Sequence, residues 1–234
     1  MREGIIIIFL IFFISSCATT GKENIDKASA HYQLGVSYFN EGRIQMAYVE
    51  FQKALELNPD DKTVLNAVGV VYLEFEDMQK AESAFLKAVA LDPNFSEAYN
   101  NLGATYGRMG RWSDAVNSFK AALKNPVYQK QEVAYNSIGD AYYRLGRIDE
   151  AIESYREAVK RVQDFYRPYY GLSLCYNSKG QYGDAATAIT RAINLDPLFG
   201  GDRDKATEYF ENRRLQAKGE ELKEIDDYLE ILKY

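Results

Sequence analysis

The sequence predicts an all-α protein built as a solenoid of helix pairs, and three observations support this prediction. Glycines recur 34 residues apart at Gly35, Gly69 and Gly103, and Gly139 follows after 36. Alanines and aromatic residues recur at matching places after each of these glycines. Hydrophobic residues make up 47% and charged residues 26% of the 234 residues, which is ordinary for a folded chain. A fixed period of this length indicates stacked repeats that bury one continuous core.

Five repeats cover residues 28–199. Their boundaries are 28–61, 62–95, 96–131, 132–165 and 166–199. The second repeat carries the pattern most completely, in the order Val68-Gly69, Tyr72, Ala81, Phe85, Ala88 and Pro93. This pattern resembles the tetratricopeptide repeat (TPR). The resemblance implies a TPR solenoid in which the first helix of each repeat lines a concave groove that binds other proteins.

Each recurring position has a physical task. Glycine and alanine are small, so the two helices of a repeat can approach closely, and the aromatic rings fill the space between them. A second set of glycines marks the turn between the helices, where a positive φ is accessible to glycine without strain. Its members are Gly42, Gly110, Gly146 and Gly180. The fourth repeat lacks the terminal proline, and the fifth has Ser173 at the glycine position.

The N-terminus is predicted to be a targeting segment. Residues 1–16 read as a signal peptide, because Arg2 precedes an apolar run from Gly4 to Ile14. That run is shorter than the ~20 residues that span a bilayer.

The run ends in Ile14-Ser15-Ser16-Cys17, which resembles the bacterial lipobox. The resemblance implies a lipoprotein with acyl chains such as palmitate on Cys17, and residues 17–27 as a flexible lipidated tether. Ala18 stands where an aspartate would favour the inner membrane, so the resemblance implies the periplasmic face of the outer membrane. An ordinary cleaved signal peptide with an incidental cysteine is the alternative.

Residues 200–234 are charged, with apolar residues at helical spacing. They predict one or two C-terminal helices that cap the last repeat, as solenoids require. A helix that swings free and binds a partner is the alternative.

Groove-facing residues follow from the register of the repeats. They are apolar near the N-terminus and rich in asparagine in the middle, and asparagine can pair with the backbone of an extended peptide. The candidate peptide-binding residues are Tyr32, Val36, Phe39, Asn66, Val70, Leu73, Asn100, Asn101, Ala104, Arg108, Asn136, Asp140, Tyr143, Tyr170 and Leu174. Trp112 aligns with Ile44, Met78, Ile148 and Tyr182, which favours a packing role.

Other function classes find little support. The net charge is −6, without a basic stripe, so we expect no nucleic-acid partner. The single histidine, His31, and the absence of nucleophile, CxxC or phosphate-loop motifs predict no metal, no cofactor and no enzyme. The lysine, asparagine and arginine pattern by which some TPR domains clamp chaperone tails is missing as well.

The junction of the third and fourth repeats carries a closer resemblance. Residues Ala122 to Tyr128 (ALKNPVY) insert two residues before the segment Glu132 to Gly139 (EVAYNSIG). This junction resembles that of the type IV pilus biogenesis lipoproteins called pilotins. The resemblance implies a membrane-anchored scaffold whose client is a secretin subunit of the pilus pore. A lipoprotein adaptor for cell-wall hydrolases or outer-membrane protein assembly is the alternative.

Overall fold

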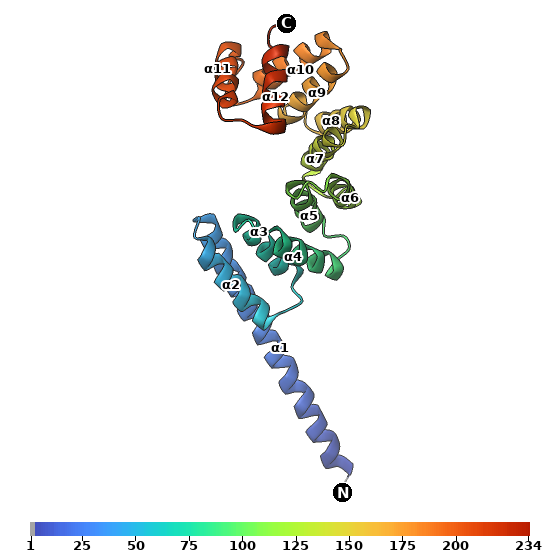
Figure 1. Cartoon of the computed structure of the whole chain (residues 1–234). Coiled ribbons are helices and arrows are strands. Elements are labelled where there is room, and N and C mark those ends of the chain that lie inside the picture. The colour runs from blue at the N-terminus through green and yellow to red at the C-terminus, as the bar shows by residue number, and fades with distance from the viewer. Residues whose placement is uncertain (1–2) are drawn as a thin grey trace. The chain divides into compact units, whose positions relative to one another are not determined.

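The computed structural model describes the backbone of residues 3–234 and the side chains from Lys22 onward. Within this range the chain forms twelve helices and no strand (Figure 1). The helices fall into two compact units, Met1–Thr105 and Tyr106–Tyr234. The prediction of an all-α repeat fold is confirmed.

The helices of the first unit form pairs that match the predicted repeats. They are α1 (Glu3–Asn40), α2 (Ile44–Leu57), α3 (Lys62–Glu74), α4 (Met78–Leu91) and α5 (Ser96–Arg108), the last of which ends in the second unit. Helix α1 packs on α2 and α3 packs on α4, while α2 joins the two pairs by packing on α3.

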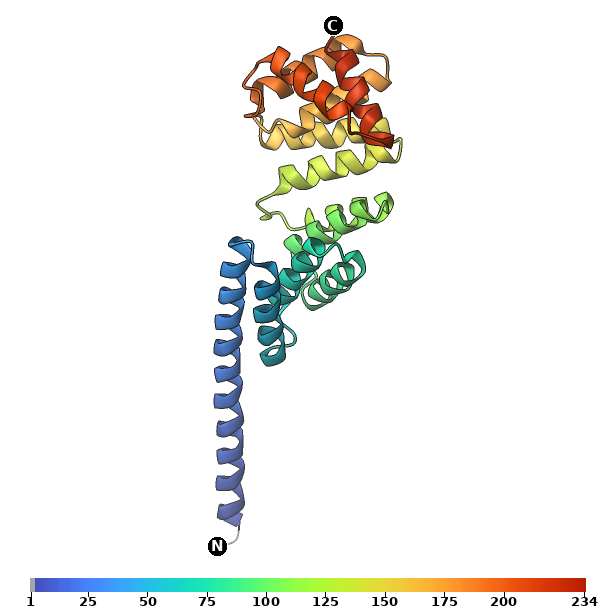
Figure 2. The same ribbon diagram turned by 60° about the vertical axis from the view of Figure 1, so that its left-hand side comes forward.

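The second unit repeats this arrangement and adds the tail. Its helices are α6 (Trp112–Ala122), α7 (Gln131–Arg144), α8 (Ile148–Arg161), α9 (Arg167–Ser178), α10 (Tyr182–Leu195), α11 (Arg203–Arg214) and α12 (Gly219–Ile231). Helix α7 pairs with α8 and α9 with α10, and α8 packs on α9. Figure 2 shows α7 to α10 as successive layers.

The N-terminal segment differs from the expected tether. Helix α1 runs without a break from Glu3 to Asn40, so residues 17–27 are helical rather than irregular. This stretch contains no proline that would end the helix. The Cys17 side chain lies outside the described side chains. In the part of the chain that the structure describes, no helix is long and apolar enough to cross a membrane.

Close approach of paired helices explains the signature glycines. A Cβ atom on Gly69 would lie 2.5 Å from the Phe85 ring, so any side chain there would displace the ring. The same contact joins Gly35 to Phe51 and Gly139 to Tyr155. In the fifth repeat Ile189 stands in place of the ring and Ser173 in place of the glycine, and both are buried. The glycine and the aromatic residue therefore change together.

The predicted turn glycines adopt the left-handed conformation. Their φ angles are +74°, +72°, +71° and +71° at Gly42, Gly110, Gly146 and Gly180. In the first of these turns the backbone N–H of Gly42 donates to the Phe39 carbonyl, and that of Arg43 donates to the Tyr38 carbonyl. These bonds satisfy carbonyl groups at the end of the first helix.

The second repeat makes the same turn with a glutamate. Glu76 has φ +56°, a conformation that costs an L-residue about 1–2 kcal/mol. We expect Glu76→Gly to raise the free energy of unfolding of the first unit by about 0.5–1 kcal/mol, after the entropy of the glycine is subtracted. Urea denaturation followed by circular dichroism measures this change. Glu74→Gly, at the last residue of α3, is the matched control and should not raise stability, because Glu74 lies in the helix and glycine is a poor helix former. A lower free energy of unfolding for Glu76→Gly than for the wild type would contradict the prediction that Glu76 is strained.

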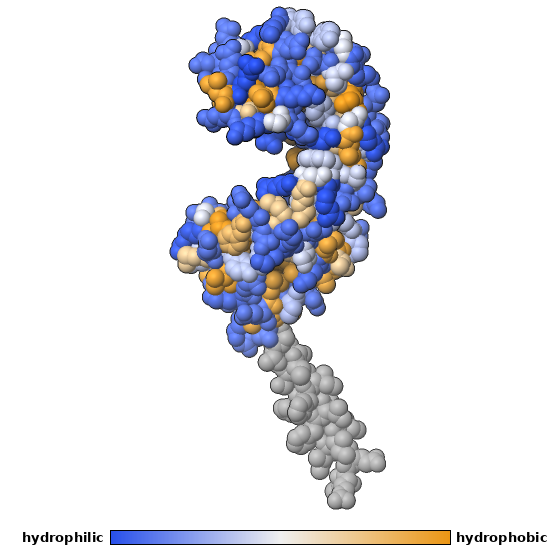
Figure 3. Space-filling view, viewed as in Figure 1, coloured by the Kyte–Doolittle hydropathy of each residue, from blue (hydrophilic) through white to orange (hydrophobic). Residues whose placement is uncertain are grey.

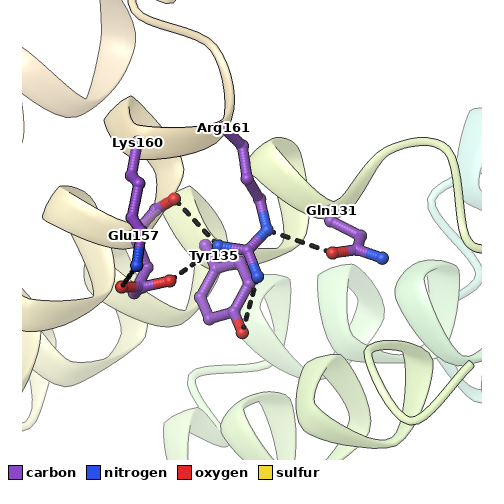
Figure 4. Close-up of polar contacts among 5 residues, drawn as sticks. All are labelled: Gln131, Tyr135, Glu157, Lys160 and Arg161. Atoms are coloured by element: carbon purple, nitrogen blue, oxygen red, sulfur yellow. Dashed lines mark hydrogen bonds and ion pairs between the residues drawn. The ribbon is translucent and has the colours of Figure 1, made fainter. Parts of the chain in front are cut away.

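The junction between the third and fourth repeats is longer than the others. Helix α6 has 11 residues whereas α8 has 14, and residues 123–130 connect α6 to α7. Arg161, in the last turn of α8, holds the start of α7 in place (Figure 4). Its guanidinium donates to Gln131 at 3.0 Å and lies 4.1 Å from the centre of the Tyr135 ring. Glu157 completes the cluster by accepting from Arg161 at 2.7 Å.

The tail packs onto the last repeat. Helix α12 lies against α9 and α10 as well as α11 (Figure 2). Their shared core consists of Ala185, Ile189, Ile193, Phe199, Ala206, Phe210, Ile225, Ile231 and Leu232. The tail is thus built into the second unit instead of swinging free.

On the faces visible in Figure 3, hydrophobic residues occur in small groups among hydrophilic ones.

Candidate functional site

The predicted groove residues of the first unit lie on the first helices of their repeats. All nine are half-buried, namely Tyr32, Val36, Phe39, Asn66, Val70, Leu73, Asn100, Asn101 and Ala104. Asn101 donates from Nδ2 to Oδ1 of Asn66 at 3.0 Å, which joins two repeats. The Tyr32 ring lies 5.8 Å from the Phe51 ring, so part of this set supports the core. Arg108, beyond this unit, is exposed.

In the second unit the structure gathers the predicted residues around one cavity of about 580 Å³. The five predicted residues in its wall are Asn136, Asp140, Tyr143, Tyr170 and Leu174. They come from α7 and α9, the first helices of the fourth and fifth repeats. The predicted groove positions of the fourth and fifth repeats therefore lie together in one wall of a cavity.

Asp140 is the central polar residue of this wall. Its Oδ1 accepts a hydrogen bond from the Tyr155 hydroxyl at 2.8 Å, and its Oδ2 accepts from Asn136 Nδ2 at 3.0 Å. The carboxylate remains accessible to solvent along the cavity, although protein surrounds it closely. Desolvation by the surrounding protein raises the pKa of Asp140 to about 6, against the lowering effects of the Tyr155 hydrogen bond and of the Arg144 and Arg167 charges.

The tail supplies the opposite wall. Arg144, on α7, forms ion pairs with Glu220 at 2.6 Å and Glu224 at 2.9 Å, both on α12. The rings of Tyr170 and Tyr228 meet edge to face, with centroids 5.6 Å apart. Burial raises the pKa of Glu224, which indicates that α12 brings its carboxylate into the same enclosed space.

The sequence did not predict the tail as part of the lining, nor several residues of the repeats themselves. The tail contributes Phe210, Arg213, Glu224 and Tyr228, and the repeats add Trp112, Arg144, Tyr155 and Arg167. Glu220, Glu224 and Tyr228 are four residues apart, so they share one face of a helix. That spacing was a usable signal, but it does not say against which repeat the helix lies. Trp112 lines the cavity with its half-buried ring in addition to packing.

The raised pKa of Asp140 leads to a pH-dependent prediction. An acid that ionises near 3.8 when unfolded and near 6 when folded holds its proton more tightly in the fold. Wild-type protein thus gains stability relative to Asp140→Asn as pH falls from above 6 to about 4. We therefore compare the free energy of unfolding of Asp140→Asn with that of the wild type. The difference, variant minus wild type, should be largest near pH 8 and should decrease toward pH 4. Urea titrations at several pH values measure it, with the exposed Asp149→Asn as control. A constant difference across this range would contradict the shift.

Comparison with known proteins agrees with the repeat architecture. Sequence models of the tetratricopeptide repeat match residues 28–61, 63–95, 84–117 and 136–198, which together make up more than half of the chain. No curated protein sequence matches the chain.

Several solved structures have a similar fold. PilF of Pseudomonas aeruginosa is 20% identical with a TM-score of 0.69, and the match covers 87% of this chain and 98% of PilF. PilW, a type IV pilus biogenesis factor, is 19% identical with a TM-score of 0.70, covering 86% and 91%. YrrB, a TPR protein with an unusual peptide-binding site, is 19% identical with a TM-score of 0.63, covering 81% and 95%. At these identities the likeness establishes the fold alone.

Proposed function

The chain belongs to the tetratricopeptide-repeat family, and from this premise we propose that it is an envelope assembly scaffold that binds a client protein in its second unit. A TPR scaffold acts through protein–protein interaction, and the proposed role contains no catalytic step. The cavity between α7, α9 and the tail carries the proposal, because it presents hydrogen-bonding and aromatic side chains from two repeats in one wall.

The proposed client is a secretin subunit of a type IV pilus. The two-residue insertion at residues 123–130 and the lipobox-like Cys17 support this proposal. PilF and PilW support it further, since each shares the fold over more than four-fifths of this chain, and PilW is a type IV pilus biogenesis factor. Fold alone does not specify a client, so the identity of the client requires an experiment.

Affinity purification from detergent-solubilised envelopes tests the client. Wild-type protein should recover a secretin, and Asn136→Arg should lose it because the new side chain enters the cavity. Asn117→Arg is the matched control, since Asn117 is exposed on α6 and is not part of the cavity. Recovery of cell-wall hydrolases or outer-membrane assembly components instead would favour the adaptor role. A client retained equally by both variants would contradict the cavity as its binding site.

Anchoring through Cys17 forms part of the proposal. A lipid at this position would hold the protein at the periplasmic face of the outer membrane, and several acyl chains together give durable anchoring. Cys17→Ser should abolish incorporation of labelled palmitate and move the protein from the membrane fraction to the soluble fraction. Cys175→Ser is the control, because Cys175 is buried in α9. Equal labelling of wild type and Cys17→Ser would overturn the anchor.

A further inference from the structure

The cavity of the second unit contains a buried hydrogen-bond acceptor without a donor. Asn136 is only 8% exposed, and its Nδ2 donates to Asp140. Its Oδ1 has no hydrogen-bond partner among the described residues. A buried acceptor without a partner costs free energy, which a ligand that brings an N–H group can recover.

Asp140 next to it also lacks a positively charged partner. Its two hydrogen bonds come from neutral groups, the Tyr155 hydroxyl and the Asn136 amide. None of the ion pairs found within residues 22–234 includes Asp140, and Arg144 and Arg167 act on it only across a distance. The site therefore presents a carboxylate and an amide oxygen that both accept hydrogen bonds.

Two of the three arginines that line the cavity are already paired with carboxylates. Arg144 is paired with Glu220 and Glu224, and Arg213 is paired with Glu221. Arg167 remains as an exposed residue of the wall. An anionic ligand would thus meet the unpaired Asp140 carboxylate as well as Arg167, whereas a cationic ligand gains from the unpaired Asp140 carboxylate.

Aromatic rings complete the wall around these acceptors. Trp112, Tyr143, Tyr170 and Tyr228 all line the cavity. The faces of such rings attract ammonium and guanidinium groups, and the effect is stronger where water is excluded. Arg144 already uses the Trp112 ring in this way, with its Cζ 6.0 Å from the centre of the ring.

We propose that this cavity receives a basic side chain, lysine or arginine, of the client protein. The cation would donate to the Asp140 carboxylate and, after a small rotation of the amide, to Oδ1 of Asn136. Its aliphatic stem would lie between the aromatic rings. This inference rests on the proposed function, because it names the chemistry of the client segment that enters the same cavity.

Trp112 makes the test direct, since it is the only tryptophan of the chain and lies in the cavity wall. Its fluorescence is recorded during titration with four blocked pentapeptides, Gly-Gly-X-Gly-Gly, where X is lysine, arginine, norleucine or glutamate. The lysine or arginine peptide should give a saturable change, and the other two should bind at least about tenfold more weakly. Asp140→Asn should weaken the basic peptide by about tenfold or more, the scale of one charge-assisted hydrogen bond.

Asp149→Asn is the control, because Asp149 is an exposed carboxylate on α8 that pairs with Lys179 and is not part of the cavity. It should leave the titration unchanged. Circular dichroism verifies that each variant is folded. If Asp140→Asn does not fold, the comparison of the basic peptides with the norleucine peptide on wild-type protein still tests the inference. Equal binding of norleucine or glutamate peptides, or no response to any peptide up to millimolar concentration, overturns the inference. If the peptide titration fails in this way but Asn136→Arg still loses the client in the affinity purification, the inference is wrong and the proposed function stands.

Discussion

Tyr155→Ala is expected to lower the free energy of unfolding of the second unit by about 3–5 kcal/mol, the usual cost of removing a buried aromatic side chain. Tyr155 is only 2% exposed. Its ring fills the space between two glycines, since a Cβ atom would lie 2.5 Å from the ring at Gly139 and 2.2 Å at Gly171. The ring therefore joins the fourth repeat to the fifth. Urea denaturation followed by Trp112 fluorescence reports this unit.

Tyr155→Phe is the matched control, because it keeps the ring and removes only the hydrogen bond to Asp140. Its expected cost is about 1–2 kcal/mol, as for a hydrogen bond to a charged group that remains partly hydrated. Equal losses in the two variants would show that the hydroxyl, rather than the ring, stabilises this junction. The Phe variant should also raise the pKa of Asp140, since that hydrogen bond lowers it in the wild type.

Deletion of residues 217–234, which removes α12, is expected to cost the second unit at least about 4 kcal/mol. The deletion takes Ile225, Ile231 and Leu232 out of the shared core, where each such side chain contributes about 2–5 kcal/mol. In a repeat array this loss falls first on the nearest repeat. Amides of α9 and α10 should then exchange with solvent much faster, while those of α3 and α4, in the first unit, keep their protection.

Leu215→Ala is the control for this deletion, because Leu215 is an apolar tail residue that is 84% exposed. It should leave exchange in α9 and α10 unchanged. Unaltered protection of α10 after the deletion would mean that the fifth repeat is stable without its cap. The tail would then be an addition to the fold instead of part of its core.

The repeats could be predicted from the sequence because their decisive contacts recur at fixed spacing. The spacing of 16 positions from Gly69 to Phe85 returns from Gly35 to Phe51 and from Gly139 to Tyr155, so one period reveals all three contacts. The turn glycines follow in the same way. Glu76 is the exception, because a non-glycine residue adopts the left-handed conformation there, with the backbone N–H groups of Glu76 and Asp77 donating to the carbonyls of Leu73 and Tyr72.

The position of the tail could not be predicted in this manner. Residues 200–234 fall outside the period, and their helical spacing fits packing against any repeat. Only the folded chain shows that Glu220 and Glu224 meet Arg144 on α7, in the fourth repeat. As a result, the sequence predicted five residues of the cavity wall but not the contribution of α11 and α12 to it.

The shared construction of the cavity couples ligand binding to the folding of the C-terminus. Because α12 forms one wall, a ligand in the cavity binds only chains whose tail is folded. By mass action, a ligand at 100 times its dissociation constant would stabilise that folded tail by about 2.7 kcal/mol. A protease that cleaves the transiently released α12 would then act about a hundredfold more slowly on the occupied scaffold. The time for which α12 survives in the presence of such a protease would therefore report whether the cavity is occupied.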